Sequence, residues 1–374
     1  MKVRKSQTIH RRDTENTERA QSFILSLRPL CVLCVSAVSL LFFVLVLALS
    51  MTGCKTSGKA AEQKPAMARC MEELNDFPVM AAVLKSRNKE HETTGRPLEG
   101  MEIALTINGM VRSQGEPENG EDNWCEAENS PENFDKLVSA LKRNQMPPVV
   151  AFVSGNHLDR ALAEKWTGSG NILGNMTYSR KKARKKDAEE FIADIARNAE
   201  VIEEYGQIKS KHNYFRFPFL KPNRVPQTRE QVRAYLKKHN YLEVSATIDA
   251  QDNRFSQLSC AAAARGDQTC INLIKQHFKT LLLDKTVKAR RAAKKMADRD
   301  VKHILMIGAT QFTCDNLAEI LAWYHSLGVR FVTLEEALRD PFHTTVDEKG
   351  RLVGRAIIGK VKRQQLSRSH TEEH

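Results

Sequence analysis

The sequence lacks several features that would assign it to a class directly. It contains no internal repeat, which excludes a repeat architecture. Its one Cys-x-x-Cys pair, Cys31 and Cys34, lies inside a long apolar run, so no paired-cysteine zinc site is indicated. Its densest basic stretch has no interleaved aromatic residues, so nucleic acid is not an expected partner.

The composition that remains is that of a folded, strongly basic protein. Hydrophobic residues make up 41% of the 374 residues and charged residues 28%, a balance typical of globular rather than disordered chains. The formal net charge is +13. Such a surface favours polyanionic partners, and anionic lipid or anionic glycan fits best once nucleic acid is set aside.

The N-terminal region predicts a membrane anchor. An apolar stretch from Leu30 to Leu49 is long enough to cross a bilayer as a helix, and seven Lys/Arg precede it. This asymmetry keeps the N-terminus cytoplasmic and sends the rest of the chain across. The stretch leads into Met51-Thr52-Gly53-Cys54, which resembles a bacterial lipobox with Cys54 as the lipidated residue.

Two interpretations of residues 1–54 therefore stay open. The favoured one is a signal peptide cleaved before a lipidated Cys54, and the other is an uncleaved signal anchor. Both predict a protein of the bacterial cell envelope, attached to the membrane, with its bulk outside the cytoplasm. An oxidising compartment permits disulfides, and Cys260 with Cys270 is the closest candidate pair, although the sequence does not fix the pairing.

The remaining chain divides into three segments. Residues 55–98 predict a flexible tether and lead-in, residues 99–340 a single domain, and residues 341–374 a basic, polar tail. Within the domain, strand-like runs alternate with helical patterns. The expected strands lie at 101–107, 148–154, 214–219, 241–248, 303–307 and 330–334.

This alternation predicts an α/β fold with a parallel sheet. Its length, with about seven units, indicates a closed or nearly closed (β/α) barrel rather than an open sheet, and in such barrels the chemistry lies at the C-terminal ends of the strands. Ser130-Pro131 is expected to open one helix, and Thr228 with Gln231 a second through a capping box. Long helices are expected at about 268–299 and at 314–326.

The strand ends carry motifs in a specific order. They read L-T-I-N-G-M, G-N-M-T-Y-S-R, F-R-F-P-F-L, T-I-D-A-Q-D-N, I-L-M-I-G-A-T and R-F-V-T-L-E-E-A-L. From about residue 100 to 338 this order resembles the NodB-type polysaccharide deacetylases, carbohydrate esterase family 4. The resemblance implies the NodB-homology fold, a distorted (β/α) barrel with about seven parallel strands, and an ancestral activity of metal-dependent N-deacetylation of glycans. It also makes a simple Asn-Gly hairpin after residue 107 the less favoured interpretation.

The same resemblance indicates that the catalytic set is replaced. Asn108 stands at the position of the catalytic base and Gly308 at that of the general acid. The metal ligands of the family correspond to Gly109, Met176 and Arg180. An asparagine is not a base near neutral pH, and neither glycine nor arginine provides a zinc ligand. A shift of the alignment does not help, because residues 106–113 contain no acidic residue.

Several supporting residues of the family are retained. Arg216 matches the arginine that orients the base, and Asp249 or Asp252 matches an acid that tunes the catalytic histidine. The resemblance places Tyr178, Pro218 and Phe219 in the wall of the sugar groove, with Arg180 and Arg216 beside it. The basic run 179–186 begins at Arg180 and, unless it is only a solvated face, extends a positive field along a helix. Its members are Arg180, Lys181, Lys182, Arg184, Lys185 and Lys186.

Two functions follow as alternatives. The first is a catalytically inactive, envelope-anchored protein of the deacetylase fold that binds a glycan, with an anionic one favoured, or a protein partner, and needs no cofactor. The second is an active N-deacetylase of peptidoglycan or a chitin-like glycan with a rebuilt site, which would require zinc. A protein whose basic face alone acts is a weaker third possibility.

Overall fold

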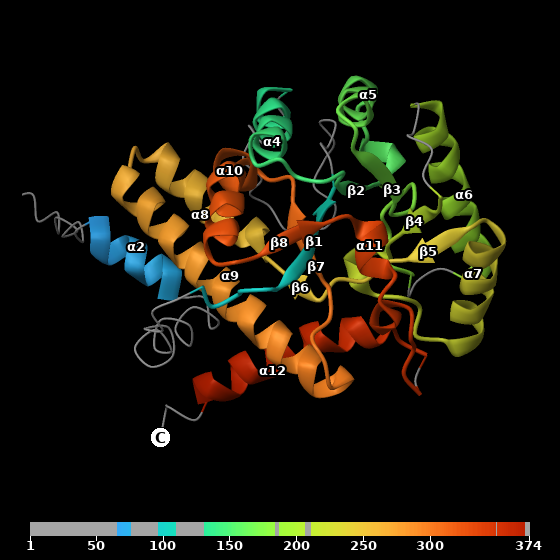
Figure 1. Cartoon of the computed structure of the whole chain (residues 1–374). Helices are drawn as coiled ribbons and strands as arrows, with labels where there is room; N and C mark the ends of the chain where they lie inside the picture. Colours follow the sequence, from blue (N-terminus) through green and yellow to red (C-terminus); the bar gives the residue numbers. More distant parts are fainter. Residues whose placement is uncertain are drawn as a thin grey trace, which may run out of the picture. The chain divides into compact units, whose positions relative to one another are not determined.

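A parallel sheet forms the centre of the part of the chain that the structure describes (Figure 1). The structure is a computed structural model and describes residues 66–75, 96–109, 131–183, 187–205, 211–348 and 350–370. All its strands pair in parallel. They are β1 (Glu102–Asn108), β2 (Val150–Val153), β3 (Ile172–Asn175), β4 (Asn213–Phe215), β5 (Tyr241–Glu243), β6 (Ile248–Asp249), β7 (His303–Gly308) and β8 (Arg330–Val332).

The strand order confirms the predicted α/β barrel and shows where it is distorted. The path runs β5-β4-β3-β2-β1-β7-β6, and β8 pairs with β1 outside this path. Strand β7 pairs along β1 from Ile103 to Asn108, whereas β8 pairs only with Glu102–Ala104 and β2 only with Thr106–Asn108. The sheet therefore branches at β1, and β5 and β6 lie at the two ends of the path.

Helices enclose this sheet (Figure 1). Several begin at a side chain that accepts a hydrogen bond from the backbone N–H three residues on, as N-cap residues do; these are Asp159, Asp187, Asp267, Thr310 and Thr333. The helices are α2 (Ala66–Asn75), α4 (Pro131–Arg143), α5 (Arg160–Gly168), α6 (Ala188–Glu204), α7 (Pro226–Lys238), α8 (Asp252–Ala264), α9 (Gln268–Ala297), α10 (Gln311–Ser326), α11 (Leu334–Leu338) and α12 (Val353–His370).

The two faces of the sheet bury different residues. The outward face contributes Ile103, Leu105 and Ile107 to a large apolar cluster that also takes in buried residues of α4, α9 and α10. The opposite face lines the interior of the half-barrel, with Ala104, Val150, Phe152 and Tyr214. Alternation along β1 therefore assigns Thr106 and Asn108 to the interior face, beside Ala104.

Some predicted element boundaries were wrong. The run 214–219 is a strand only over Asn213–Phe215, after which Pro218–Leu220 forms a 3-10 turn, because a proline cannot donate to a strand ladder. The Thr228–Gln231 capping box does not open a helix, since α7 already begins at Pro226. Pro131 does open α4 as predicted. Residues 172–175 form the strand β3, where the sequence had indicated a strand end near Gly174 but no strand run.

The segments on either side of the predicted domain are also structured. In the lead-in, α2 is joined to α9 by a disulfide between Cys70 and Cys270, so the predicted Cys260–Cys270 pair is wrong. Cys260 is itself disulfide-bonded. The Cys70–Cys270 bond closes a loop with a sequence separation of 200, which corresponds to about 2–5 kcal/mol of stabilisation.

The predicted polar tail folds back onto the domain. Leu352, Ile357 and Val361 are buried, and α12 packs against α9. The pattern was missed because the three apolar residues are embedded in a basic stretch with weak periodicity. No helix of the described residues is both long and apolar enough to cross a membrane, and the run Leu30–Leu49 lies outside them.

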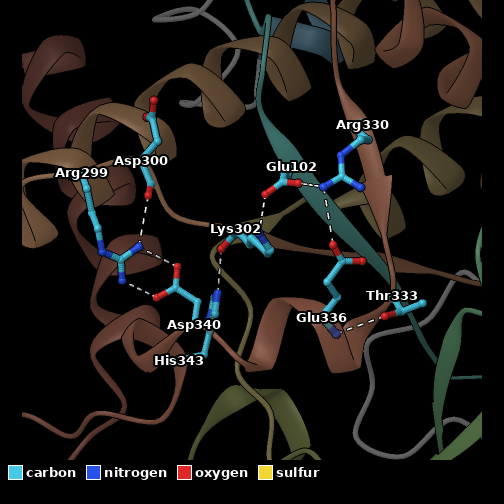
Figure 2. Close-up of polar contacts among 9 residues, drawn as sticks. All are labelled: Glu102, Arg299, Asp300, Lys302, Arg330, Thr333, Glu336, Asp340 and His343. Atoms are coloured by element: carbon cyan, nitrogen blue, oxygen red, sulfur yellow. Dashed lines mark hydrogen bonds and ion pairs between the residues drawn. The ribbon is translucent and has the colours of Figure 1, made fainter.

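A polar network fastens the N-terminal ends of the strands (Figure 2). Glu102 of β1 bonds Lys302, which precedes β7, and Arg330 of β8, which also reaches Glu336. Asp340 forms two hydrogen bonds with Arg299, at 2.8 and 2.5 Å. These contacts join β1, β8 and the segment before β7 to one another and to α11, and they lie at the end of the barrel opposite the one where such barrels place their chemistry.

Candidate functional site

The C-terminal ends of three neighbouring strands meet in one row. Asn108 of β1 is in register with Phe152 of β2 on one side and with Gly308 of β7 on the other. Residues in register on neighbouring parallel strands face the same side of the sheet, so all three positions face the barrel interior. They lie at the end of the sheet where the resemblance places catalysis. The structure thus brings together the positions predicted for the base and for the general acid.

The three positions predicted for metal ligands do not form a metal site. Gly109 has no side chain and a φ of +81°. Met176 is 1% exposed and belongs to the apolar cluster inside the half-barrel. Arg180 carries a permanent positive charge. Because these groups provide no zinc ligand set, the residues present do not fit the metal that the family uses. The described residues contain no group of three or more His, Cys, Asp and Glu placed to hold a metal ion.

The position of the general acid has been closed by a neighbouring carboxylate. A Cβ added at Gly308 would lie 2.9 Å from Oδ2 of Asp252 and 3.2 Å from Oδ1 of Asn253. Asp252 is held there because it accepts hydrogen bonds from the Gly308 N–H at 3.0 Å and from the Thr313 hydroxyl at 2.8 Å. A histidine side chain at position 308 would therefore displace Asp252.

Asp252 consequently fixes structure rather than tuning a histidine. It is 5% exposed, and burial raises the pKa of its carboxyl group. Its hydrogen bonds join the start of α8 to the end of β7 and, through Thr310 and Thr313, to the first turn of α10. Removing this carboxylate would leave the donors of that junction unpaired.

Arg216 lies inside the barrel and does not orient Asn108. It is 0% exposed. Nη2 donates to the Thr106 hydroxyl at 3.0 Å, Nε donates to the Val244 carbonyl at 3.4 Å, and the guanidinium carbon lies 3.9 Å from the centre of the Phe152 ring. Burial lowers the pKa of Arg216 to about 9, and the charge of nearby Asp249 opposes that shift.

The segment after β3 is held rigidly by its own polar side chains. Asn175 accepts a hydrogen bond from the Thr177 N–H, and Thr177 accepts one from the Arg180 N–H. Both Thr177 and Arg180 adopt positive φ angles, of 67° and 54°. Asp194 of α6 accepts hydrogen bonds from the N–H and the hydroxyl of Ser179. This set of contacts fixes where Tyr178 and Arg180 are presented.

Two aromatic residues predicted for the groove wall differ in exposure. Tyr178 is half-buried beneath Arg197, whose guanidinium carbon lies 3.6 Å from the ring centre. Phe219 is 48% exposed, with a φ of 57°, an uncommon conformation for a bulky residue. Arg180 lies 5.7 Å and Lys182 5.3 Å from the centre of the Phe219 ring. Pro218, by contrast, is buried.

We call Phe219, Arg180 and Lys182 the Phe219 platform. The basic run was predicted to lie along a helix, but residues 181–183 precede α6, whose N-cap is Asp187. Arg184, Lys185 and Lys186 lie outside the described residues. The sequence did not place Lys182 on Phe219, because the two residues are far apart in the chain and no local pattern links them.

A protein-family model matches part of the chain. Residues 121–244, which include β2 to β5, match the family described as polysaccharide deacetylase. The matched part of the chain is therefore similar to the polysaccharide deacetylases. The match confirms the family that the order of strand-end motifs indicated. A search of the curated proteins finds no match.

Solved structures of family members are similar at low identity. A CE4 family pseudoenzyme from Bacillus anthracis is 15% identical, with a TM-score of 0.42 over 65% of this chain and 67% of that one. The peptidoglycan N-acetylglucosamine deacetylase Bc1960 is 15% identical, with a TM-score of 0.42 over 63% and 87%. The peptidoglycan deacetylase PdaC from Bacillus subtilis is 16% identical, with a TM-score of 0.41 over 71% and 96%.

Proposed function

We propose that this polysaccharide deacetylase homologue is a non-catalytic, membrane-anchored protein of the bacterial cell envelope that binds an anionic glycan. The observation that carries the loss of catalysis is the packing at the replaced positions. Met176 fills the barrel interior, and Asp252 occupies the space that a side chain at Gly308 would need. The site has therefore been repacked, and hydrolysis would require more than the return of single residues.

The Phe219 platform supports glycan binding. An exposed, flat aromatic ring offers an apolar surface to the C–H face of a sugar, and the two cations beside it suit a carboxylate or phosphate substituent. The positive φ angles of Phe219 and Leu220 hold the ring outward at a conformational cost. Such strained residues cluster at functional sites.

Binding should therefore prefer acidic over neutral glycans and weaken as salt rises. In titrations with an acidic and a neutral glycan at low and high salt, Arg180→Ala should reduce affinity for the acidic glycan about 10-fold, because a charge-assisted hydrogen bond is lost. Phe219→Ala should reduce affinity for both glycans. Lys182→Ala should have an intermediate effect.

Lys181 provides the matched control for this experiment. It is exposed and adjacent in sequence, but no contact joins it to the Phe219 ring. Lys181→Ala should therefore cost less than Lys182→Ala and less than Arg180→Ala. If acidic and neutral glycans bind with equal affinity and the three cation variants have equal effects, the Phe219 platform is an ordinary solvated surface and not a glycan-binding site.

The proposed location rests on the N-terminal sequence and on the disulfides. A disulfide between Cys70 and Cys270, and a disulfide-bonded Cys260, are typical of proteins outside the cytoplasm. Cys54 is the expected lipidation site, and it lies outside the described residues.

Cys54 should be the first residue of the mature protein and should carry the lipid. In bacterial cells fed a labelled fatty acid, the wild-type chain should incorporate label and lack residues 1–53, whereas Cys54→Ala should remain full-length and unlabelled. Cys70→Ala serves as a control, since it removes a cysteine near the anchor without touching the cleavage site. A wild-type chain that retains its leader and takes up no lipid would favour the signal anchor instead.

A further inference from the structure

Arg216 is a buried cation without a paired anion. Within the part of the chain that the structure describes, no carboxylate forms an ion pair with its guanidinium, and Nη1 has no hydrogen-bond partner. Its contacts are a hydroxyl, a backbone carbonyl and an aromatic ring, all of them neutral. The positive charge therefore lies in the barrel interior with no direct counterion among the described residues.

An unpaired charge of this kind is costly to bury. Arginine remains protonated at neutral pH, so it does not escape the desolvation cost by losing its proton. Leaving a buried ion without a partner strongly destabilises a folded protein. A negative charge supplied from solution would offset this cost.

A second unfilled polar atom lies on the same interior face. Oδ1 of Asn108 is buried and has no hydrogen-bond partner. Asn108 is in register with Phe152, and the Phe152 ring stacks on the Arg216 guanidinium, so both polar side chains border this ring. Thr106, two residues before Asn108 on the same face, accepts the hydrogen bond from Arg216. The two unfilled groups therefore flank one small interior region.

Charged groups of both signs lie near this region. Asp249 acts on Arg216 at a distance, but Lys285, 4% exposed, brings a second cation to the same strand end by donating to the Asp249 carbonyl at 2.7 Å. Asp252 is engaged by Gly308, Thr310 and Thr313. Asn108 and Asp249 are both partly exposed, so the strand ends that border this region lie near the protein surface.

We propose that this interior region is a binding site for a small monovalent anion of the size of formate. The anion would accept hydrogen bonds from Nη1 of Arg216 and, after a half-turn of the amide, from Nδ2 of Asn108. It would supply the negative charge that a carboxylate at position 108 would otherwise provide. The site is distinct from the Phe219 platform, and the proposal does not depend on glycan binding.

The test uses thermal unfolding of the full chain in detergent, in a zwitterionic buffer at pH 7. Sodium formate is titrated against equal additions of sodium glucuronate, which carries the same charge on a body too large for the site. Formate should raise the Tm by a few degrees and saturate, whereas glucuronate should not. Asn108→Asp should raise the Tm without formate and abolish the formate response, because the protein then provides its own anion.

Two further variants separate this site from other basic surfaces. Asn108→Ala adds no charge and should keep the formate response, although weakened by the loss of the amide. Arg180→Ala removes a cation from the Phe219 platform and should leave the response unchanged. The proposal is overturned if formate and glucuronate act alike, or if Asn108→Asp responds to formate as the wild type does. It is also overturned if Arg180→Ala alone removes the response.

Discussion

The compact unit Lys64–His374 should release no acetate from an N-acetylglucosamine oligomer, with or without added zinc. The expected loss of deacetylation rate is very large. General acid–base catalysis alone contributes about 10²–10⁴-fold to such a rate, and metal activation of water contributes further. The physical reason is that Asn108 and Gly308 cannot carry the protons. Met176 and Gly109 provide no ligand that suits zinc. Acetate release and metal content measured on one preparation check both statements.

Single restorations should not rescue activity. Gly308→His should destabilise the protein, since its Cβ would lie 2.9 Å from Asp252. Gly109→Asp has open space around the Cβ position and should be tolerated better, although its positive φ adds strain. Zinc at one ion per chain, with acetate release that a chelator stops and Asn108→Ala abolishes, would show instead that the site is active.

Acidification should begin to destabilise this protein above the pH range in which ordinary carboxylates protonate. His303 is 1% exposed, and burial lowers its pKa to about 3. The folded state therefore keeps this imidazole neutral while the unfolded chain binds a proton below its ordinary pKa of about 6.5. Stability present above pH 6.5 is thus lost as the pH falls towards 3, by several kcal/mol.

The groups around His303 also favour a lowered pKa for its imidazole. Its Nδ1 lies 3.1 Å from the Thr247 hydroxyl, and its Nε2 has no hydrogen-bond partner, so a proton added there would not be stabilised. His343 and Arg290 disfavour a positive charge at His303, whereas Asp300 and Asp340 favour it more weakly. The pKa of His343 is also lowered by burial.

Urea unfolding of the unit Lys64–His374 between pH 7.5 and 5 measures this effect. His303→Gln should be less stable at pH 7.5 but should lose less stability on acidification than the wild type. His325→Gln is the matched control, because His325 is exposed at the end of α10. A slope of stability against pH that is the same in wild type and His303→Gln would refute the assignment to this residue.

The strands illustrate what local pattern can and cannot predict. The β1 and β7 runs were predicted within one residue, because a central parallel strand is buried on both faces and reads as continuous apolar sequence. The short strand β3 was not predicted as such, since Gly174 and Asn175 are poor strand formers. Gly174 is required there because a Cβ would lie 2.8 Å from the Phe152 ring.

The sequence was enough to indicate the similarity to polysaccharide deacetylases and the parallel α/β fold, and to predict that the catalytic residues are replaced. These depend on residue identity and on the order of motifs, both of which can be read along the chain. Only the folded chain shows which side chains surround and fill the replaced positions. Met176 joins the core, Asp252 closes over Gly308, and Lys182 lies on Phe219. Among the described residues, Arg216 has no carboxylate partner. Each of these features depends on which segments, distant in sequence, come together in the fold. Such contacts are determined by side-chain packing and electrostatics once the sheet has formed.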